Sequence, residues 1–140
     1  MKEEPKTLKG RVITILPALI VAGGIWFLSS QSTLPQPKGV FGFDKLQHLV
    51  AYLVLAVTVG MGIPSAFWQA RRFTAFFLVV FIASGYGVVD EIHQWFTPGR
   101  DCNVWDWIAD TLGALLGAAV MTGVNAGLLD KIRTRFGAAA

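Results

Sequence analysis

Long apolar stretches alternate with short polar connections along the chain. Four apolar stretches cover residues 12–28, 46–63, 73–89 and 108–129. A helix needs about 20 mostly apolar residues to cross a bilayer, and in lipid its backbone groups must be hydrogen-bonded within the segment. With their flanking residues added, the stretches predict membrane-spanning helices over roughly 12–30, 45–63, 73–95 and 105–126.

Proline and glycine mark where these helices end. Pro64 follows the second stretch, and Pro98 with Gly99 follows the third, so each position predicts a sharp break. The first stretch is longer than the apolar core of a typical signal peptide, about 7–15 residues, and we expect it to be retained. No alternation of apolar and polar residues indicates a strand. The predicted fold class is an all-α membrane protein, a four-transmembrane-helix bundle.

The composition supports a membrane protein and excludes other classes. Charged residues make up 15% of the chain, against about 25% in an ordinary soluble domain. The net charge of +3 does not indicate nucleic-acid binding, because the basic residues lie at the chain ends and in one short loop. The single cysteine, Cys102, cannot form a disulfide within the chain or a zinc-finger motif. No motif for a cofactor or a metal is present, so we assign neither.

Lysine and arginine are distributed asymmetrically about the predicted helices. Nine of them lie in the N-terminal arm, the loop after the second helix and the C-terminal tail, whereas Lys38, Lys45 and Arg100 lie on the other side. Because cytoplasmic loops are enriched in these residues, both termini are predicted to be cytoplasmic. The predicted domains are a basic N-terminal arm (1–11), a transmembrane domain (12–129) and a basic cytoplasmic tail (130–140).

Ionisable residues gather at the predicted outer ends of three helices. The second and fourth helices begin at this level and the third ends there, so distant segments deliver polar side chains to one place. Spacings of three or four residues put many of them on shared helix faces, which we expect to meet. Charges in a span are costly and indicate a site. The predicted site residues are Asp44, Lys45, His48, Glu91, Gln94, Arg100, Asp106 and Asp110.

Some of these residues also have structural interpretations. Asp44 and Asp106 are equally consistent with helix caps. His48 is consistent with a buried hydrogen bond to Glu91 or Asp110, with acid–base or substrate contact, or with a metal ligand. These alternatives stay open on the sequence alone.

The residues around Glu91 carry two further expectations. Glu91 and Arg100 are consistent with an ion pair that ties down the loop after the third helix. Asp90 and His93 are expected to face away from Glu91, at the interface or the rim of the bundle.

Two segments, FDKLQHLVAYLVL and DEIHQWFTPGRDCNVWDWIADTLGALLG, resemble the VanZ-like family of small bacterial membrane proteins. The matching positions are Asp44, Lys45, His48, Tyr52, Glu91, Gln94, Pro98, Gly99, Arg100, Asp106, Asp110, Gly113 and Gly117. One departure is Asp110, where the family commonly has asparagine, so this chain carries an additional acid. The resemblance implies an integral protein of the bacterial cytoplasmic membrane and a link to resistance to the glycopeptide teicoplanin. It implies no mechanism.

Three functions from different classes fit the predicted pocket. In the first, Arg100, Lys45 and the helix N-termini bind an anionic membrane lipid or a lipid-linked cell-wall precursor at the outer leaflet. In the second, His48 or Glu91 is the acid or base of a membrane-embedded enzyme acting on a phosphoester or glycolipid. In the third, the chain is a structural or partner-binding subunit, or a homo-oligomer, that associates through the Gly113–Gly117 face.

Overall fold

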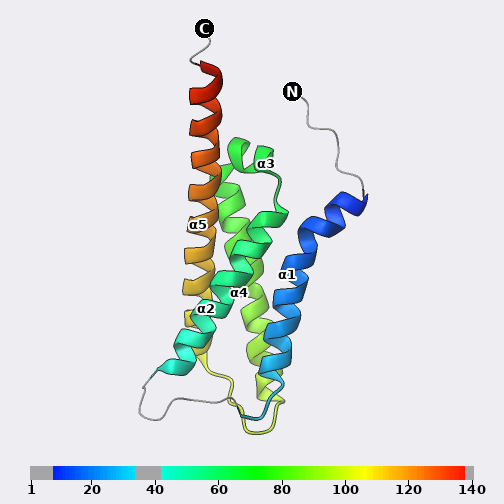
Figure 1. Cartoon of the computed structure of the whole chain (residues 1–140). Helices are drawn as coiled ribbons and strands as arrows, with labels where there is room; N and C mark the ends of the chain where they lie inside the picture. The colour runs from blue at the N-terminus through cyan, green and yellow to red at the C-terminus, as the bar shows by residue number, and fades with distance from the viewer. Residues whose placement is uncertain (1–7, 34–41, 138–140) are drawn as a thin grey trace.

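The computed structural model describes residues 8–33 and 42–137, and the side chains of 13–33 and 42–127. Within these ranges the regular secondary structure is entirely helical (Figure 1). The helices are α1 (Leu8–Ser29), α2 (Phe43–Gly62), α3 (Ser65–Ala70), α4 (Arg72–Trp95) and α5 (Val104–Gly137). The predicted N-terminal arm (1–11) and C-terminal tail (130–140) lie entirely outside the described side chains.

Among the residues that the structure describes, three helices are long and apolar enough to cross a membrane, namely α2, α4 and α5 as far as Gly127. Helix α1 contributes a shorter apolar segment, Ile13–Ser29. Large apolar side chains cover the outside of the bundle, and Phe73 and Phe81 are 75% and 78% exposed. Contiguous exposed apolar surface of this kind is rare on a soluble monomer. The prediction of a helical membrane protein is therefore confirmed.

Helix α2 lies at the centre of the bundle and packs against α1, α4 and α5 (Figure 1). Its contact with α5 is close because Gly113 and Gly117 have no side chains there. A Cβ on Gly113 would overlap the carbonyl oxygen of Leu49, and one on Gly117 would lie 2.6 Å from the carbonyl oxygen of Leu53. The Gly113–Gly117 face is thus a helix-packing face, and it packs against α2 of the same chain.

Helix α1 lies at the edge of the bundle, and Figure 1 shows its N-terminal end leaning away from the other helices. Pro17 lies inside this helix, where a proline removes one backbone hydrogen bond and bends the helix axis. Nearer its C-terminal end, α1 is tied to α4 by Tyr86, whose hydroxyl donates to the carbonyl oxygen of Ala22 at 2.8 Å. The splayed end and the tied end together leave a groove beside α1.

The short helix α3 was not predicted, because six residues are too few to show a helical period. Pro64 ends α2 as expected and directly precedes α3. Trp68 anchors the connection, because its side chain is buried and its Nε1 donates to the carbonyl oxygen of Gly60 at 3.2 Å. The turn between α2 and α4 is therefore a packed element of the fold.

Candidate functional site

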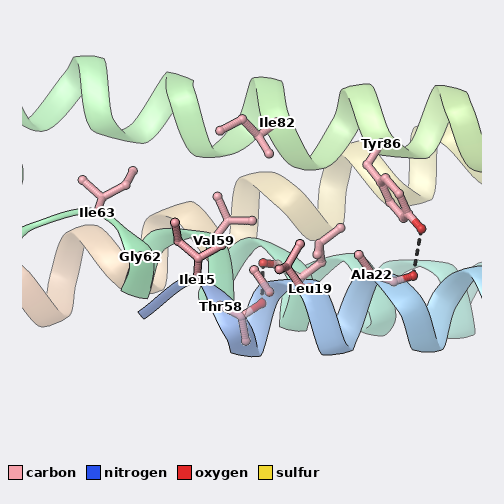
Figure 2. A pocket seen from close by; sticks show the side chains of 11 residues that line it. Ile15, Leu19, Ala22, Thr58, Val59, Gly62, Ile63, Ile82 and Tyr86 are labelled. Carbon is pink, nitrogen blue, oxygen red and sulfur yellow. Dashed lines mark hydrogen bonds between the residues drawn. The ribbon is translucent and has the colours of Figure 1, made fainter. Parts of the chain in front are cut away.

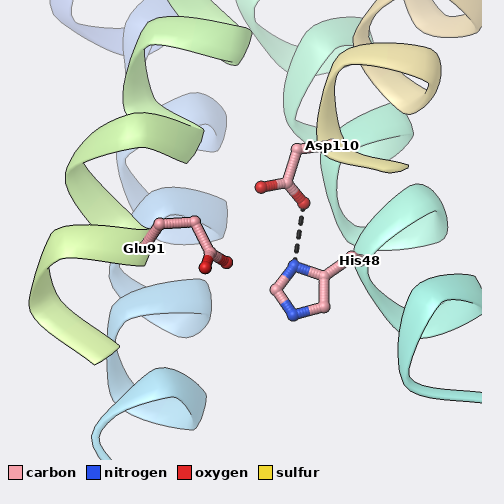
Figure 3. A group of neighbouring side chains, drawn as sticks. All are labelled: His48, Glu91 and Asp110. Carbon is pink, nitrogen blue, oxygen red and sulfur yellow. Dashed lines mark hydrogen bonds and ion pairs between the residues drawn. The ribbon is translucent and has the colours of Figure 1, made fainter. Parts of the chain in front are cut away.

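Three ionisable side chains from three helices meet at the end of the bundle where α2 and α5 begin and α4 ends. His48 comes from α2, Glu91 from α4 and Asp110 from α5, and Figure 3 shows all three pointing into the space between the helices. His48 Nδ1 lies 2.8 Å from Asp110 Oδ1. One ligand atom from each residue lies within 4.8 Å of the other two. The predicted convergence of these residues therefore occurs, although they are up to 62 positions apart in sequence.

The helix packing explains how Asp110 fits among its neighbours. Gly87 lies one turn before Glu91 on α4, and the carboxylate of Asp110 fills the space that a larger residue would occupy. A Cβ on Gly87 would lie 2.8 Å from Asp110 Oδ2. As a result Asp110 is fully buried and Glu91 is 4% exposed.

Several polar atoms around this cluster have no hydrogen-bond partner within the described part of the chain. Glu91 Oε2 accepts from the backbone N–H of Asn103 at 2.7 Å, but Glu91 Oε1, Asp110 Oδ2 and the hydroxyl of Tyr52 have none. Nearly all buried polar groups in native proteins are paired, and an unpaired one costs about 1–3 kcal/mol. Unpaired buried carboxylate oxygens beside an imidazole indicate a site for a proton, a water or a cation.

Lys45 neutralises two acids of the chain itself. Its Nζ lies 2.5 Å from Asp44 Oδ2 and 2.6 Å from Asp106 Oδ1. This ion-pair triad links the first turn of α2 to the first turn of α5. Lys45 is consequently less available to an anionic ligand than its sequence position suggests.

Neither Asp44 nor Asp106 caps a helix, so that interpretation is wrong. Gly42 precedes α2 with φ 76° and offers no side-chain cap. At the start of α5 the cap comes from Asn103, whose Oδ1 accepts from the N–H of Trp105 at 3.0 Å. Asn103 thus caps α5 through its side chain and binds Glu91 through its backbone, which makes it a site residue that the sequence analysis missed.

Arg100 forms no ion pair with any residue that the structure describes, and its Nε is buried without a hydrogen-bond partner. The expected ion pair between Glu91 and Arg100 is therefore wrong, because the backbone of Asn103 takes that carboxylate. Arg100 instead faces a cavity of about 320 Å³ beside the cluster. Five of the predicted site residues line this cavity: Asp44, His48, Gln94, Arg100 and Asp106.

Asp90 faces away from Glu91, as expected, but it is fully buried, so its expected place at the interface or rim is wrong. It faces α1, where Ser29 Oγ donates to its Oδ2 at 2.9 Å and Gln94 Nε2 donates to the same atom at 3.1 Å. His93 is half-buried and stacks on Trp26 with ring centroids 3.8 Å apart. Gln94 therefore stabilises the contact between α1 and α4 and also lines the cavity.

Cys102 is exposed in the loop between α4 and α5. Reduced contact with water and the nearby carboxylate of Glu91 raise the pKa of its thiol above the ordinary value. Since a thiol is reactive only as the thiolate, the raised pKa lowers the reactive fraction of Cys102 at a given pH.

Comparison with known proteins agrees with the motifs noted in the sequence. The model of the VanZ/LLP1 family matches residues 6–125. This range contains the His48, Glu91 and Asp110 cluster, the Lys45 triad and Arg100. No curated protein and no solved structure matches the chain. Because the family match covers most of the 140 residues, the chain belongs to the VanZ/LLP1 family.

Proposed function

We propose that this protein binds the anionic head group of a membrane lipid, or of a lipid-linked cell-envelope component, in the cavity beside His48. The observation that carries the proposal is Arg100, a guanidinium that faces the cavity with no carboxylate partner in the described structure. A guanidinium presents several N–H donors in a planar fork that suits phosphate, and it keeps its charge at every physiological pH. A phosphate would supply the partner that Arg100 lacks.

A second feature suits a lipid rather than a free anion. An apolar groove of about 350 Å³ lies between α1, α2 and α4 (Figure 2). Its wall on α2 runs from Leu55 to Ile63, which is about 10 to 22 Å along the helix from His48 at 1.5 Å per residue. A lipid whose phosphate lies beside His48 would place its hydrocarbon chain at this depth.

The proposed location follows from the positive charges. Arg71 and Arg72 lie at the opposite end of the bundle from Arg100 (Figure 1). With basic segments facing the cytoplasm, both termini are cytoplasmic and the cavity opens on the outer side of the bacterial cytoplasmic membrane. Lipid-linked wall precursors are exposed at this leaflet, so binding them would alter the access of teicoplanin to its target.

The test is retention of undecaprenyl phosphate by the purified protein in nanodiscs of zwitterionic lipid, followed by native mass spectrometry. We expect Arg100→Gln to lower retention at least about tenfold, because it removes a charged hydrogen-bond donor. Arg100→Lys should have an intermediate effect, since lysine cannot bind in a bidentate manner. Arg71→Gln is the matched control, because it removes the same charge at the other end. Unchanged retention in Arg100→Gln would contradict the proposal.

A second candidate function is hydrolysis of a phosphoester. It is favoured by the hydrogen bond between His48 and Asp110, because a carboxylate that orients an imidazole is a common arrangement for a general base. The test is release of inorganic phosphate from undecaprenyl phosphate or diphosphate over time. Turnover that His48→Gln abolishes, while Arg71→Gln leaves it intact, would make the protein an enzyme.

The third candidate function is a subunit that associates through the Gly113–Gly117 face. The structure does not favour it, because this face is covered within the chain. That face packs against Leu49 and Leu53 of α2, so another chain cannot use it in this fold. Association through a different face is compatible with the structure, but no described residue favours it.

A further inference from the structure

We propose that His48, Glu91 and Asp110 hold a divalent metal ion, and that this ion binds the phosphate of the lipid head group together with Arg100. The inference deepens the proposed function and rests on it for the identity of the ligand. The metal site itself rests on the geometry of the three side chains (Figure 3).

The distances suit a shared ion. Two adjacent ligands at about 2.1 Å from one metal lie about 3 Å apart, and His48 Nδ1 lies 2.8 Å from Asp110 Oδ1. An ion that replaces the hydrogen between these two atoms would keep their separation nearly unchanged. The Glu91 oxygen lies within 4.8 Å of both, and opposite ligands on one ion are about 4.2 Å apart. Because this oxygen can lie opposite only one of the two atoms and about 3 Å from the other, a shift of Glu91 by up to about 2 Å completes the set.

Two buried carboxylate oxygens of the cluster have no partner in the described part of the chain. Asp110 Oδ2 and Glu91 Oε1 have no hydrogen-bond partner among the described residues, and both side chains are more than nine-tenths buried. Buried carboxylates are expected to be paired or to coordinate a metal. Lys45 pairs with Asp44 and Asp106, and Arg100 pairs with neither acid of the cluster. His48 contacts Asp110 through Oδ1 alone, so Asp110 Oδ2 and Glu91 Oε1 stay without a partner among the described residues. Two carboxylates and a neutral imidazole carry the charge that a divalent ion balances.

The donor set indicates the class of metal. One imidazole nitrogen with two carboxylates suits Mn²⁺ or Zn²⁺ better than Ca²⁺, which prefers oxygen ligands alone. Three protein ligands leave coordination positions open for other oxygens, as in metal sites that bind substrates. An ion here also explains how an acid-rich pocket can attract an anion, because the metal reverses the local charge.

Binding of Mn²⁺ alone to metal-free protein tests the site, with the free ion followed by electron paramagnetic resonance. We expect one bound ion per chain, and at least about tenfold weaker binding in Glu91→Gln and Asp110→Asn. The matched control is Asp101→Asn, because Asp101 is an exposed acid on the same cavity but outside the cluster. Equal Mn²⁺ binding by all three variants, or none by the unaltered protein, would overturn the proposal.

Two further measurements distinguish failure of the metal site from failure of the lipid-binding function. Anomalous scattering from crystals of the unaltered protein grown with Mn²⁺ locates the ion without any substitution, and a peak away from His48, Glu91 and Asp110 would overturn the site. Retention of undecaprenyl phosphate with and without Mn²⁺ separates the two proposals. Mn²⁺ bound at the cluster without lipid retention supports the metal site and contradicts the lipid function. Lipid retained equally without any Mn²⁺ binding supports the lipid function and overturns the metal site.

Discussion

Gly87 on α4 makes room for the carboxylate of Asp110 on α5, since a Cβ at Gly87 would lie 2.8 Å from Oδ2 and 3.2 Å from Cβ of Asp110. Gly87→Ala should therefore displace the buried carboxylate. Overpacking a tight site costs about 1–3 kcal/mol, so we expect a lower thermal unfolding midpoint in detergent and weaker binding at the cluster.

The matched control is Gly85→Ala on the same helix. A Cβ at Gly85 meets nothing within 4 Å, and alanine favours helix over glycine by about 1 kcal/mol. Gly85→Ala should leave the unfolding midpoint unchanged or raise it. Equal destabilisation by both substitutions would show that helix flexibility, and not the space for Asp110, explains the effect.

The contact of Gly113 with α2 gives a second prediction. A Cβ there would overlap the carbonyl oxygen of Leu49 and lie 2.9 Å from the backbone nitrogen of Leu53. Backbone atoms cannot move aside as the end of a side chain can, so Gly113→Ala must separate α5 from α2. We expect a large fall in the detergent unfolding midpoint. Gly123→Ala on the same helix, where a Cβ meets nothing within 4 Å, should be neutral.

The apolar pattern predicted the long helices well because each membrane span must satisfy its own backbone hydrogen bonds. The second and fourth helices begin at the level where the third ends, and this arrangement, with helical spacing, predicted that His48, Glu91 and Asp110 would meet. Helix α3 escaped prediction, since it is held by one buried side chain, Trp68, and not by a repeating pattern. A single anchoring contact leaves little trace in a sequence.

Sequence spacing could not predict which acid each cation meets. Lys45, Asp44 and Asp106 form one triad because α2 and α5 begin side by side, and that register depends on glycine packing further along the helices. Glu91 and Asp90 are neighbours in sequence, yet one faces the cluster and the other faces α1. Helical geometry separates adjacent side chains by about 100°, but it does not say which helix lies on each side.

The buried carboxylate of Asp90 gives a third prediction. Ser29 Oγ is one of two side chains among the described residues that donate a hydrogen bond to Asp90. Ser29→Ala removes this hydrogen bond, so the cost of burying the Asp90 carboxylate is offset less. We expect a loss of about 1–3 kcal/mol in the free energy of unfolding, measured by titration with a denaturing detergent. Ser30→Ala is the control, because the exposed Ser30 hydroxyl, just after α1, donates to the carbonyl oxygen of Trp26 in α1 and not to Asp90. Equal losses would contradict the role of Ser29.

Cys102 provides a direct test of the proposed orientation, because it is the chain's single cysteine and is exposed in the loop beside the cluster. A membrane-impermeant maleimide added to spheroplasts should label Cys102 without lysis. The control is Cys102→Ser carrying a new cysteine at Arg71, at the opposite end of the bundle, which should be labelled only after lysis. The reverse pattern would place the cavity on the cytoplasmic side.

The pKa of the Cys102 thiol gives the last prediction. Reduced contact with water and the Glu91 carboxylate raise this pKa, so less thiolate is present at neutral pH and alkylation should be slower than in the same chain denatured in SDS. The rate should keep rising at a pH where the denatured chain has levelled off. Glu91→Gln removes the negative charge, so it should lower the pKa and speed alkylation at neutral pH. A pH profile that Glu91→Gln leaves unchanged would show that the carboxylate does not lie beside the thiol, and the placement of the loop around Asn103 would then be wrong.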